Sequence, residues 1–217
     1  MITRTEKKNI IRQEIIDSAR NYSDYLAGKT FLYVFANEFF EVVFPSDHFL
    51  HLTGVETALD KKNFYRKSKR EQLTNQQFYF SSRHPYATAK KKLPCLKRLS
   101  ELTTNMVCIL KEMHIQSVVY KLSVTNLEFT LGLTEDIDSN EHKKSGLFLP
   151  MSLRIEDKSV ENSDDGDIVD YIFSKSASDS KYNTMLVQDK EKILVDSVRD
   201  LIDENLIKHI DKDNLKR

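Results

Sequence analysis

Apolar side chains recur every three or four positions between residues 6 and 27, which is the spacing of one face of a helix. They are Ile10, Ile11, Ile15, Ala19, Tyr22 and Leu26. Gly28 follows the last of them, and glycine is a common helix terminator. The pattern predicts an amphipathic helix over residues 6–27.

Two β-prone runs come next, at residues 30–35 and 39–44, with Ala36, Asn37 and Glu38 between them. Asn37 can adopt the left-handed backbone of a tight turn, so we predict a hairpin. Pro45 ends the second run, and Ser46 or Asp47 is expected to cap a short helical turn that reaches Leu52.

The middle of the chain again has helical spacing. Residues 57–72 place Leu59, Phe64 and Tyr65 on one side and most of the lysines and arginines on the other. A further helix is predicted from Ser82 or Arg83. Pro94 interrupts it, and the apolar period continues over residues 95–102.

The second half of the chain contains short β-prone runs with turn residues between them, which favours an antiparallel sheet. The runs are residues 106–111, 117–123, 127–133, 147–155, 168–174 and 182–188. The polar stretch 135–146 is expected to be an exposed loop, and 162–167 a turn. Residues 190–206 again have a helical apolar face.

These elements predict an α+β fold. N-terminal helices pack on a mainly antiparallel β-sheet, with an extra hairpin near residues 31–44 and a C-terminal helix. The chain of 217 residues is expected to form a single domain. Its core spans residues 25–190, and helices at 6–27 and 190–206 flank that core.

The formal net charge of zero hides a separation of charge along the sequence. Residues 61–98 contain twelve lysines and arginines against Glu71, whereas residues 135–170 contain eleven acidic residues against four basic ones. Aromatic residues lie among the basic ones, a combination that nucleic acids exploit. Solvated helix faces and core aromatics would produce the same pattern.

Several protein classes are disfavoured. Cys95 and Cys108 do not form a disulfide framework and suit a reducing compartment. No apolar run reaches the roughly 20 residues of a membrane helix, and the N-terminus lacks a secretory pattern, so a cytoplasmic protein is expected. Common nucleotide-binding and hydrolase motifs do not occur. The spacing of histidines and cysteines predicts no metal site and no cofactor.

Candidate chemistry begins with His51, which lies among apolar neighbours and directly precedes Leu52, Thr53 and Gly54. Histidine is the side chain best suited to proton transfer near neutral pH, and Thr53 would lie beside it at the edge of a cleft. A histidine packed in the core and bonded to backbone is the competing interpretation, and the periodicity alone favours it.

A second candidate is the row Ser152, Arg154 and Glu156, because residues two apart on a strand point to the same side. A hydroxyl, a guanidinium and a carboxylate on one face can bind a phosphodiester, with arginine as a bidentate clamp. An exposed sheet face with an Arg–Glu pair is the alternative.

Several segments resemble the phage-associated Barnase–EndoU–colicin–RelE-like nuclease domains, fourth subtype. The resemblance rests on residues 31–35, 39–44 and 49–55, on Asn63-Phe64-Tyr65, on His84-Pro85-Tyr86-Ala87 with Lys90–Leu93, and on residues 150–154. It covers residues 25–190. It implies a compact α+β domain with a cleft on its antiparallel sheet.

The resemblance also implies metal-independent RNA cleavage, in which the 2′-hydroxyl attacks the adjacent phosphate and leaves a cyclic phosphate. The expected catalytic residues are His51, Thr53, Tyr65, Ser152 and Arg154. The expected RNA-binding residues are Lys61, Lys62, Lys90, Lys91 and Lys92. RNA is the expected partner, with a cognate inhibitor or a phage or host protein as a further one. The alternative is a non-catalytic module that binds nucleic acid or protein and retains the fold.

Overall fold

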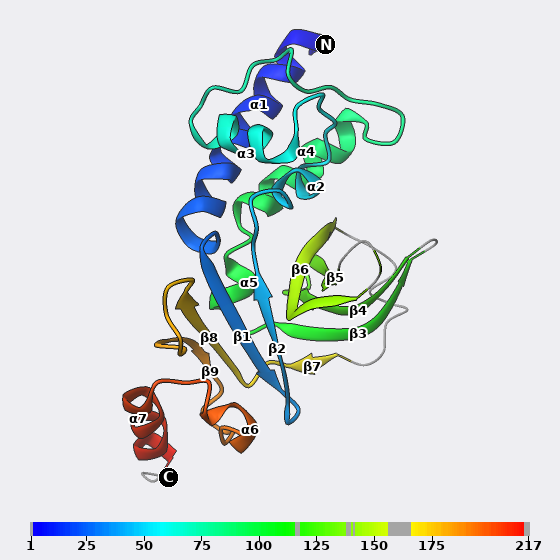
Figure 1. Ribbon diagram of the computed structural model, residues 1–217. Coiled ribbons are helices and arrows are strands. Elements are labelled where there is room, and N and C mark those ends of the chain that lie inside the picture. The colour runs from blue at the N-terminus through cyan, green and yellow to red at the C-terminus, as the bar shows by residue number, and fades with distance from the viewer. Residues whose placement is uncertain (1, 116–117, 138–139, 141, 156–165, 215–217) are drawn as a thin grey trace.

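The strands of the computed structural model form one curled sheet (Figure 1). The structure describes residues 2–115, 118–137, 140, 142–155 and 166–214. The strands are β1 (Lys29–Phe35), β2 (Glu38–Val43), β3 (Cys108–Ile115), β4 (Val118–Thr125), β5 (Phe129–Ile137), β6 (Lys143–Ile155), β7 (Asp167–Ile168), β8 (Tyr171–Ser176) and β9 (Thr184–Gln188).

The sheet order is β7-β3-β4-β5-β6-β2-β1-β8-β9. Neighbouring strands are antiparallel except β2 and β6, which are parallel. The helices are α1 (Arg4–Asn21), α2 (Phe49–Thr53), α3 (Lys61–Lys69), α4 (Tyr86–Lys97), α5 (Glu101–Thr104), α6 (Asp196–Arg199) and α7 (Glu204–Asn214). The α+β class and the mainly antiparallel sheet are therefore confirmed.

The first helix begins with a capping box, in which Thr3 and Glu6 satisfy each other's backbone N–H groups. Ile11, Ile15 and Ala19 are fully buried along its inner face. The last predicted turn is a π-helix over Tyr22–Leu26, and Gly28 turns the chain into β1 with a φ of 78°. The predicted N-terminal helix is confirmed, whereas Ile10 points outward and is 44% exposed.

The predicted hairpin is β1 and β2, and Ala36 and Asn37 both have positive φ in its turn. It lies inside the sheet order, because β1 also pairs with β8 and β2 pairs with β6. Phe31 and its four successors in β1 are all buried. An unbroken apolar strand of this kind has both faces covered. Phe31, Tyr33 and Phe35 join the larger core, and Leu32 and Val34 join a second core.

Strands β3–β6 curl away from the hairpin (Figure 1). The predicted exposed loop at 135–146 is wrong at both ends, because β5 continues to Ile137 and β6 begins at Lys143. An ion pair of 2.8 Å joins Lys143 Nζ to Glu135 Oε1 across these strands. The charged side chains that resembled a loop therefore stabilise strand pairing. Residues 162–165 of the predicted turn lie outside the described residues.

The helices between the hairpin and β3 are shorter than predicted. Asp60 caps α3 through its side chain, and His48 stands at the N-cap of α2 without a side-chain bond to the backbone of that helix. The predicted cap at Ser46 or Asp47 is therefore wrong. Pro94 lies inside α4, and a turn at Arg98 separates that helix from α5.

The C-terminal helix begins later than predicted. The apolar residues of the predicted helix 190–206 are divided among an irregular segment, the short α6 and the first turn of α7, which contains Leu206. Leu194, Val198, Ile202 and Ile210 are buried in the second core, against Tyr171 and other residues of β1, β8 and β9. The C-terminal segment therefore covers the face of β1 and β8 that the N-terminal helices leave open.

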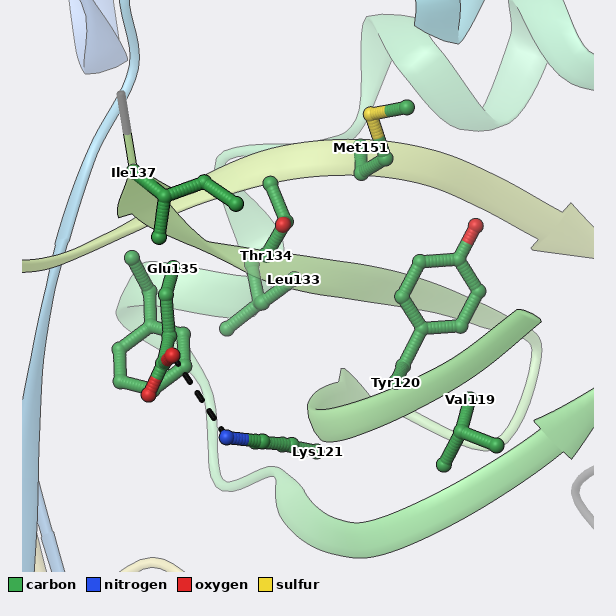
Figure 2. A pocket seen from close by; sticks show the side chains of 9 residues that line it. Val119, Tyr120, Lys121, Leu133, Thr134, Glu135, Ile137 and Met151 are labelled. Atoms are coloured by element: carbon green, nitrogen blue, oxygen red, sulfur yellow. Dashed lines mark ion pairs between the residues drawn. The ribbon is translucent and has the colours of Figure 1, made fainter. Parts of the chain in front are cut away.

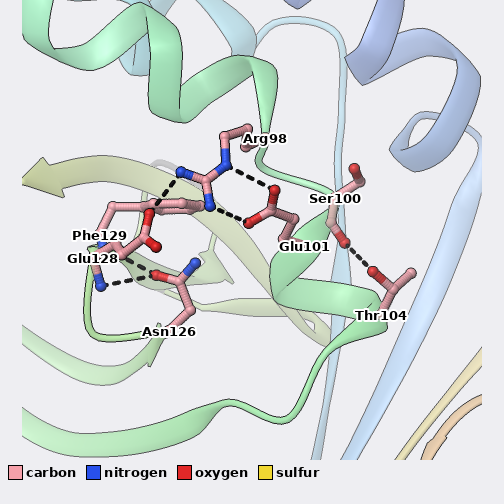
Figure 3. Close-up of polar contacts among 7 residues, drawn as sticks. All are labelled: Arg98, Ser100, Glu101, Thr104, Asn126, Glu128 and Phe129. Carbon is pink, nitrogen blue, oxygen red and sulfur yellow. Dashed lines mark hydrogen bonds and ion pairs between the residues drawn. The ribbon is translucent and has the colours of Figure 1, made fainter.

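Arg98 ties the helical layer to the sheet (Figure 3). Its Nε and Nη2 donate to the Glu101 carboxylate at 2.7 and 2.8 Å, and its Nη1 donates to Glu128 Oε2 at 2.6 Å. The guanidinium also lies 6.0 Å from the ring centre of Phe129. Asn126 accepts backbone N–H bonds from Glu128 and Phe129 and shapes the turn before β5. One side chain thus fixes the end of α4 on the sheet.

Among the described helices, none combines the length and the apolar character needed to cross a membrane.

Candidate nuclease site

Helix α2 is fixed at both ends. At its N-cap, His48 Nδ1 lies 2.8 Å from the Pro150 carbonyl on β6. A carbonyl only accepts, so Nδ1 carries the proton and α2 is tied to the sheet. At the other end, Gly54 takes the left-handed conformation with a φ of 74°, which ends the helix. His51 is half-buried on this short, anchored helix.

His51 faces Lys61, the first residue of α3, with Lys61 Nζ 2.9 Å from His51 Nε2. An ammonium only donates, so Nε2 is the accepting nitrogen of a neutral imidazole. Partial burial lowers the pKa of His51, and the positive charge of Lys61 lowers it further. His48 and Lys92 act in the same direction, while Asp47 opposes them. The imidazole is therefore a neutral proton acceptor near pH 7.

His51 lines a pocket of about 230 Å³ that also contains a second histidine, His84. The other lining residues are Leu50, Gly54, Val55, Glu56, Thr57 and Tyr79. His84 lies in the segment between α3 and α4, more than 30 residues after His51 in the sequence. Glu56 and Tyr79 form a two-way backbone bridge, with N···O distances of 3.1 and 2.8 Å, which draws that segment against the end of α2.

A small hydrogen-bonded turn holds His84 in this pocket. The Ser81 and His84 backbones are joined by an N–H···O bond of 3.1 Å, and the His84 N–H also donates to Ser81 Oγ at 3.1 Å. The Ser81 hydroxyl in turn donates to the Glu56 carboxylate. Bonds from Ser81 and Tyr79 and the nearby His84 and Arg83 lower the pKa of Glu56. Glu56 is therefore a weak base beside the two imidazoles.

Lys92 of α4 lies directly behind this pocket. A Cβ atom placed on Gly54 would be 3.1 Å from Lys92 Cδ, so the absence of a side chain on Gly54 admits the lysine. Burial lowers the pKa of Lys92 to about 8, and the charge of Arg154 contributes to this shift. Lys92 and Arg154 line a second pocket of about 200 Å³ with Thr88, Lys91, Leu153 and Ile155.

A third pocket, of about 220 Å³, lies on β4, β5 and β6 (Figure 2). Tyr120, Phe148 and Met151 make it largely apolar, and Lys121 pairs with Glu135 inside it at 3.6 Å. It is lined by no histidine, so it lacks the acid–base groups that the first pocket contains. The first pocket is therefore the better candidate for an active site.

A family model described as phage-Barnase-EndoU-ColicinE5/D-RelE like nuclease4 matches residues 14–191. The chain belongs to this nuclease family. No curated protein and no solved structure matches the chain significantly.

Every residue of the first two pockets lies within the part of the chain that the nuclease family model matches. Membership in the family indicates a nucleic acid as the substrate. Helices α6 and α7 lie beyond the match. Both pockets therefore belong to the part of the chain that matches the nuclease family. The second core behind β8 is built partly from residues that lie outside the matched range.

The structure brings together part of the predicted set. His51, Lys61, Lys92 and Arg154 lie around the two adjoining pockets. His84 was not predicted as a catalytic residue, although His84-Pro85-Tyr86-Ala87 contributed to the family resemblance. The sequence feature that could have indicated it is a histidine directly before Pro85, at the start of α4. The sequence alone does not show that His84 and His51 line the same pocket.

Thr53 and Tyr65 are placed differently. Thr53 is fully buried, and its hydroxyl donates to the Leu50 carbonyl at 2.8 Å, so it stabilises α2. Tyr65 packs edge-on against Tyr22 and beside Phe49 in the core, and burial raises its pKa. Neither lines the first pocket. Both side chains therefore contribute to the packing and hydrogen bonding of the fold around α2.

Ser152 lies on β6 opposite Gly132, two residues before Arg154. It is half-buried and lines neither of the two pockets beside α2 and α4. Its neighbour in the predicted row, Glu156, lies outside the described residues. Of the predicted RNA-binding lysines, Lys62, Lys90 and Lys91 are exposed on α3 and α4, close in sequence to Lys61 and Lys92.

Proposed function

We propose that the protein is a metal-independent ribonuclease in which His51 and His84 transfer the protons. The observation that supports this most directly is that both imidazoles line one pocket, with a lysine on the first of them. Cleavage through the 2′-hydroxyl requires a base, an acid and positive charge near the phosphate. In this proposal His51 is the base, His84 is the acid, and Lys61 supplies positive charge.

His51 is the proposed general base. Its Nε2 accepts the proton of the 2′-hydroxyl while O2′ forms a bond to phosphorus. Lys61 occupies Nε2 in the free protein. A phosphate that enters the pocket offers the ammonium a charged acceptor, so Lys61 can leave the imidazole and bind a phosphate oxygen. Substrate binding would thereby free Nε2 of His51 to accept the proton of the 2′-hydroxyl.

His84 is the proposed general acid. The bond from phosphorus to O5′ breaks as His84 gives that oxygen a proton, which leaves a 2′,3′-cyclic phosphate and a 5′-hydroxyl. Glu56 is a less suitable base than His51, since its lowered pKa lies much further from neutrality. Its carboxylate is better suited to pair with the protonated form of His84 in the same pocket.

Tyr79 and the lysines suit a single-stranded nucleic acid, and the proposed attack by a 2′-hydroxyl restricts cleavage to RNA. Tyr79 lines the pocket and is 44% exposed, so its ring is available to stack on an unpaired base. Lys61, Lys62, Lys90, Lys91 and Lys92 are proposed to contact phosphates along the strand. We accordingly propose single-stranded RNA as the substrate. A cytoplasmic ribonuclease encounters the RNA of its own cell, which is why we propose a cognate inhibitor as a protein partner.

The test is incubation of the purified protein with mixed RNA in EDTA, with His51→Ala and His84→Ala variants as controls. We expect cleavage by the wild type, with cyclic phosphate and 5′-hydroxyl ends, and loss of cleavage in both variants. RNA binding without cleavage by the wild type would instead support the alternative, a non-catalytic binding module. Products that carry 5′-phosphates would exclude the proposed chemistry.

A further inference from the structure

We propose that the pocket between α4 and β6 binds a second phosphate of the RNA, next to the one that is cleaved. Its polar lining consists of Thr88, Lys91 and Lys92 from α4 and Arg154 from β6. This inference rests on the proposed function, because it assigns the scissile phosphate to the neighbouring pocket of His51 and His84.

The chemistry of the lining suits an anion. Three of the six lining residues are cationic, one is a hydroxyl donor, and none carries a carboxylate. Leu153 and Ile155 complete the pocket with apolar surface. Arginine forms bidentate bonds to phosphate oxygens, and a lysine adds a compact charge.

The two cations are close enough to disfavour each other. The charge of Arg154 acts on Lys92, and together with burial it lowers the pKa of that lysine to about 8. Bringing like charges together in a partly buried place is unfavourable for the fold. An anion between them would remove the repulsion, so binding of a phosphate is favoured more than at isolated surface lysines.

The position of the pocket relates it to the proposed active site. Lys92 Cδ lies against Gly54, which lines the pocket of His51, and the charge of Lys92 also reaches His51. The two pockets therefore adjoin, with Gly54 and Lys92 between them. An RNA strand whose scissile phosphate sits beside His51 would place a neighbouring phosphate near Arg154. The expected substrate class is an oligonucleotide with a phosphate flanking the cleaved bond.

The test uses 2′-deoxy dinucleotides, which this mechanism does not cleave, so that binding is measured independently of catalysis. Three compounds are compared by calorimetry: one without a terminal phosphate, one with a 3′-phosphate and one with a 5′-phosphate. We expect one terminal phosphate to tighten binding about 10- to 100-fold, the usual contribution of charge-assisted bonds. Arg154→Gln should abolish this gain. The control is Lys144→Gln, since Lys144 is exposed on the same strand and should leave the gain intact.

The same comparison with cleavable ribonucleotides separates the two proposals. Equal binding of all three deoxy compounds by the wild type would overturn the second phosphate site, whether or not RNA is cleaved. Failure to cleave any RNA, combined with a phosphate gain that Arg154→Gln removes, would overturn the ribonuclease and keep the anion site. If Arg154→Gln does not fold, the wild-type ratio of affinities still decides the question.

Discussion

Lys61 and His51 are joined across two helices, with Lys61 Nζ 2.9 Å from His51 Nε2. The contact places the ammonium of Lys61 against the nitrogen that we propose as the general base. Burial and this charge both lower the pKa of His51. The imidazole therefore remains a neutral acceptor at lower pH than an unperturbed histidine would.

Lys61→Met should raise the pKa of His51 toward its ordinary value, because it removes a positive charge and keeps the aliphatic chain. Catalysis needs neutral His51, and activity is lost as the pH falls through its pKa. The acidic limb of the kcat/KM profile should therefore move to higher pH in this variant. The His51 resonances in an NMR titration should move in the same direction.

Lys62→Met is the matched control, since Lys62 is exposed on the same helix turn and is not among the groups that shift His51. It should leave the acidic limb where it is, although it can weaken RNA binding. A shift of equal size in both variants would show that the general basic field, and not the contact at Nε2, sets the pKa of His51.

The two histidines should affect opposite limbs of the pH profile. His51→Ala and His84→Ala should each reduce turnover about 10²- to 10⁴-fold, the usual contribution of a proton-transfer group. The residual activity of His51→Ala should lack the acidic limb, and that of His84→Ala should lack the basic limb. Circular dichroism should be used to check that both variants are folded. Wild-type turnover in folded His84→Ala would remove it from the proposed mechanism.

Of the two histidines in the proposed site, His51 is a candidate from the sequence and His84 is not. His51 was recognisable because it interrupts an apolar helix that ends at Gly54. His84 reaches the same pocket only through the backbone bridge between Glu56 and Tyr79 and the turn at Ser81. Neither contact has a periodicity, so no local pattern predicts it. Pairings between distant segments are set by the whole fold.

The fold shows a similar division. Helix α1 and the hairpin follow from local periodicity and turn residues, and both are confirmed. The unbroken apolar run of β1 indicates burial on both faces, which its place within the sheet explains. The end of β5 and the start of β6 looked like a loop because Glu135 and Lys143 are charged. Their cross-strand ion pair depends on a register that the sequence alone does not reveal.

Lys92→Met should make the protein more stable at neutral pH and less able to bind RNA. The folded state lowers the pKa of Lys92 from 10.5 to about 8, so the charged lysine destabilises the fold. Removing that charge should raise the free energy of unfolding by about 1–2 kcal/mol below pH 8. The gain should shrink between pH 8 and 10.5, where Lys92 is already neutral in the folded state but still charged in the unfolded chain. It should vanish at higher pH, where both states have lost the proton.

Lys90→Met provides the comparison for that measurement, because Lys90 is exposed on the same helix. Its free energy of unfolding should change by no more than about 0.5 kcal/mol. Urea denaturation of both variants at several pH values gives the result. A Lys92→Met protein that is less stable than the wild type at pH 7 would mean that the ammonium has favourable partners that exceed the unfavourable burial.

The C-terminal segment should stabilise the fold without contributing to the chemistry. Ile202 is fully buried in the second core, beyond the range that the nuclease family matches, whereas Ile193 is 78% exposed. Ile202→Ala should lower the free energy of unfolding by about 2–4 kcal/mol, because it leaves a cavity behind β8. Ile193→Ala should change it by no more than about 0.5 kcal/mol. Urea denaturation tests both values.

RNA cleavage per folded molecule, measured well below the melting temperature, should be unchanged in both variants. The reason is that the second core lies on the face of β1 opposite the larger core, which includes residues of α2 and α4. A selective loss of cleavage in folded Ile202→Ala would show that the second core also positions the pocket.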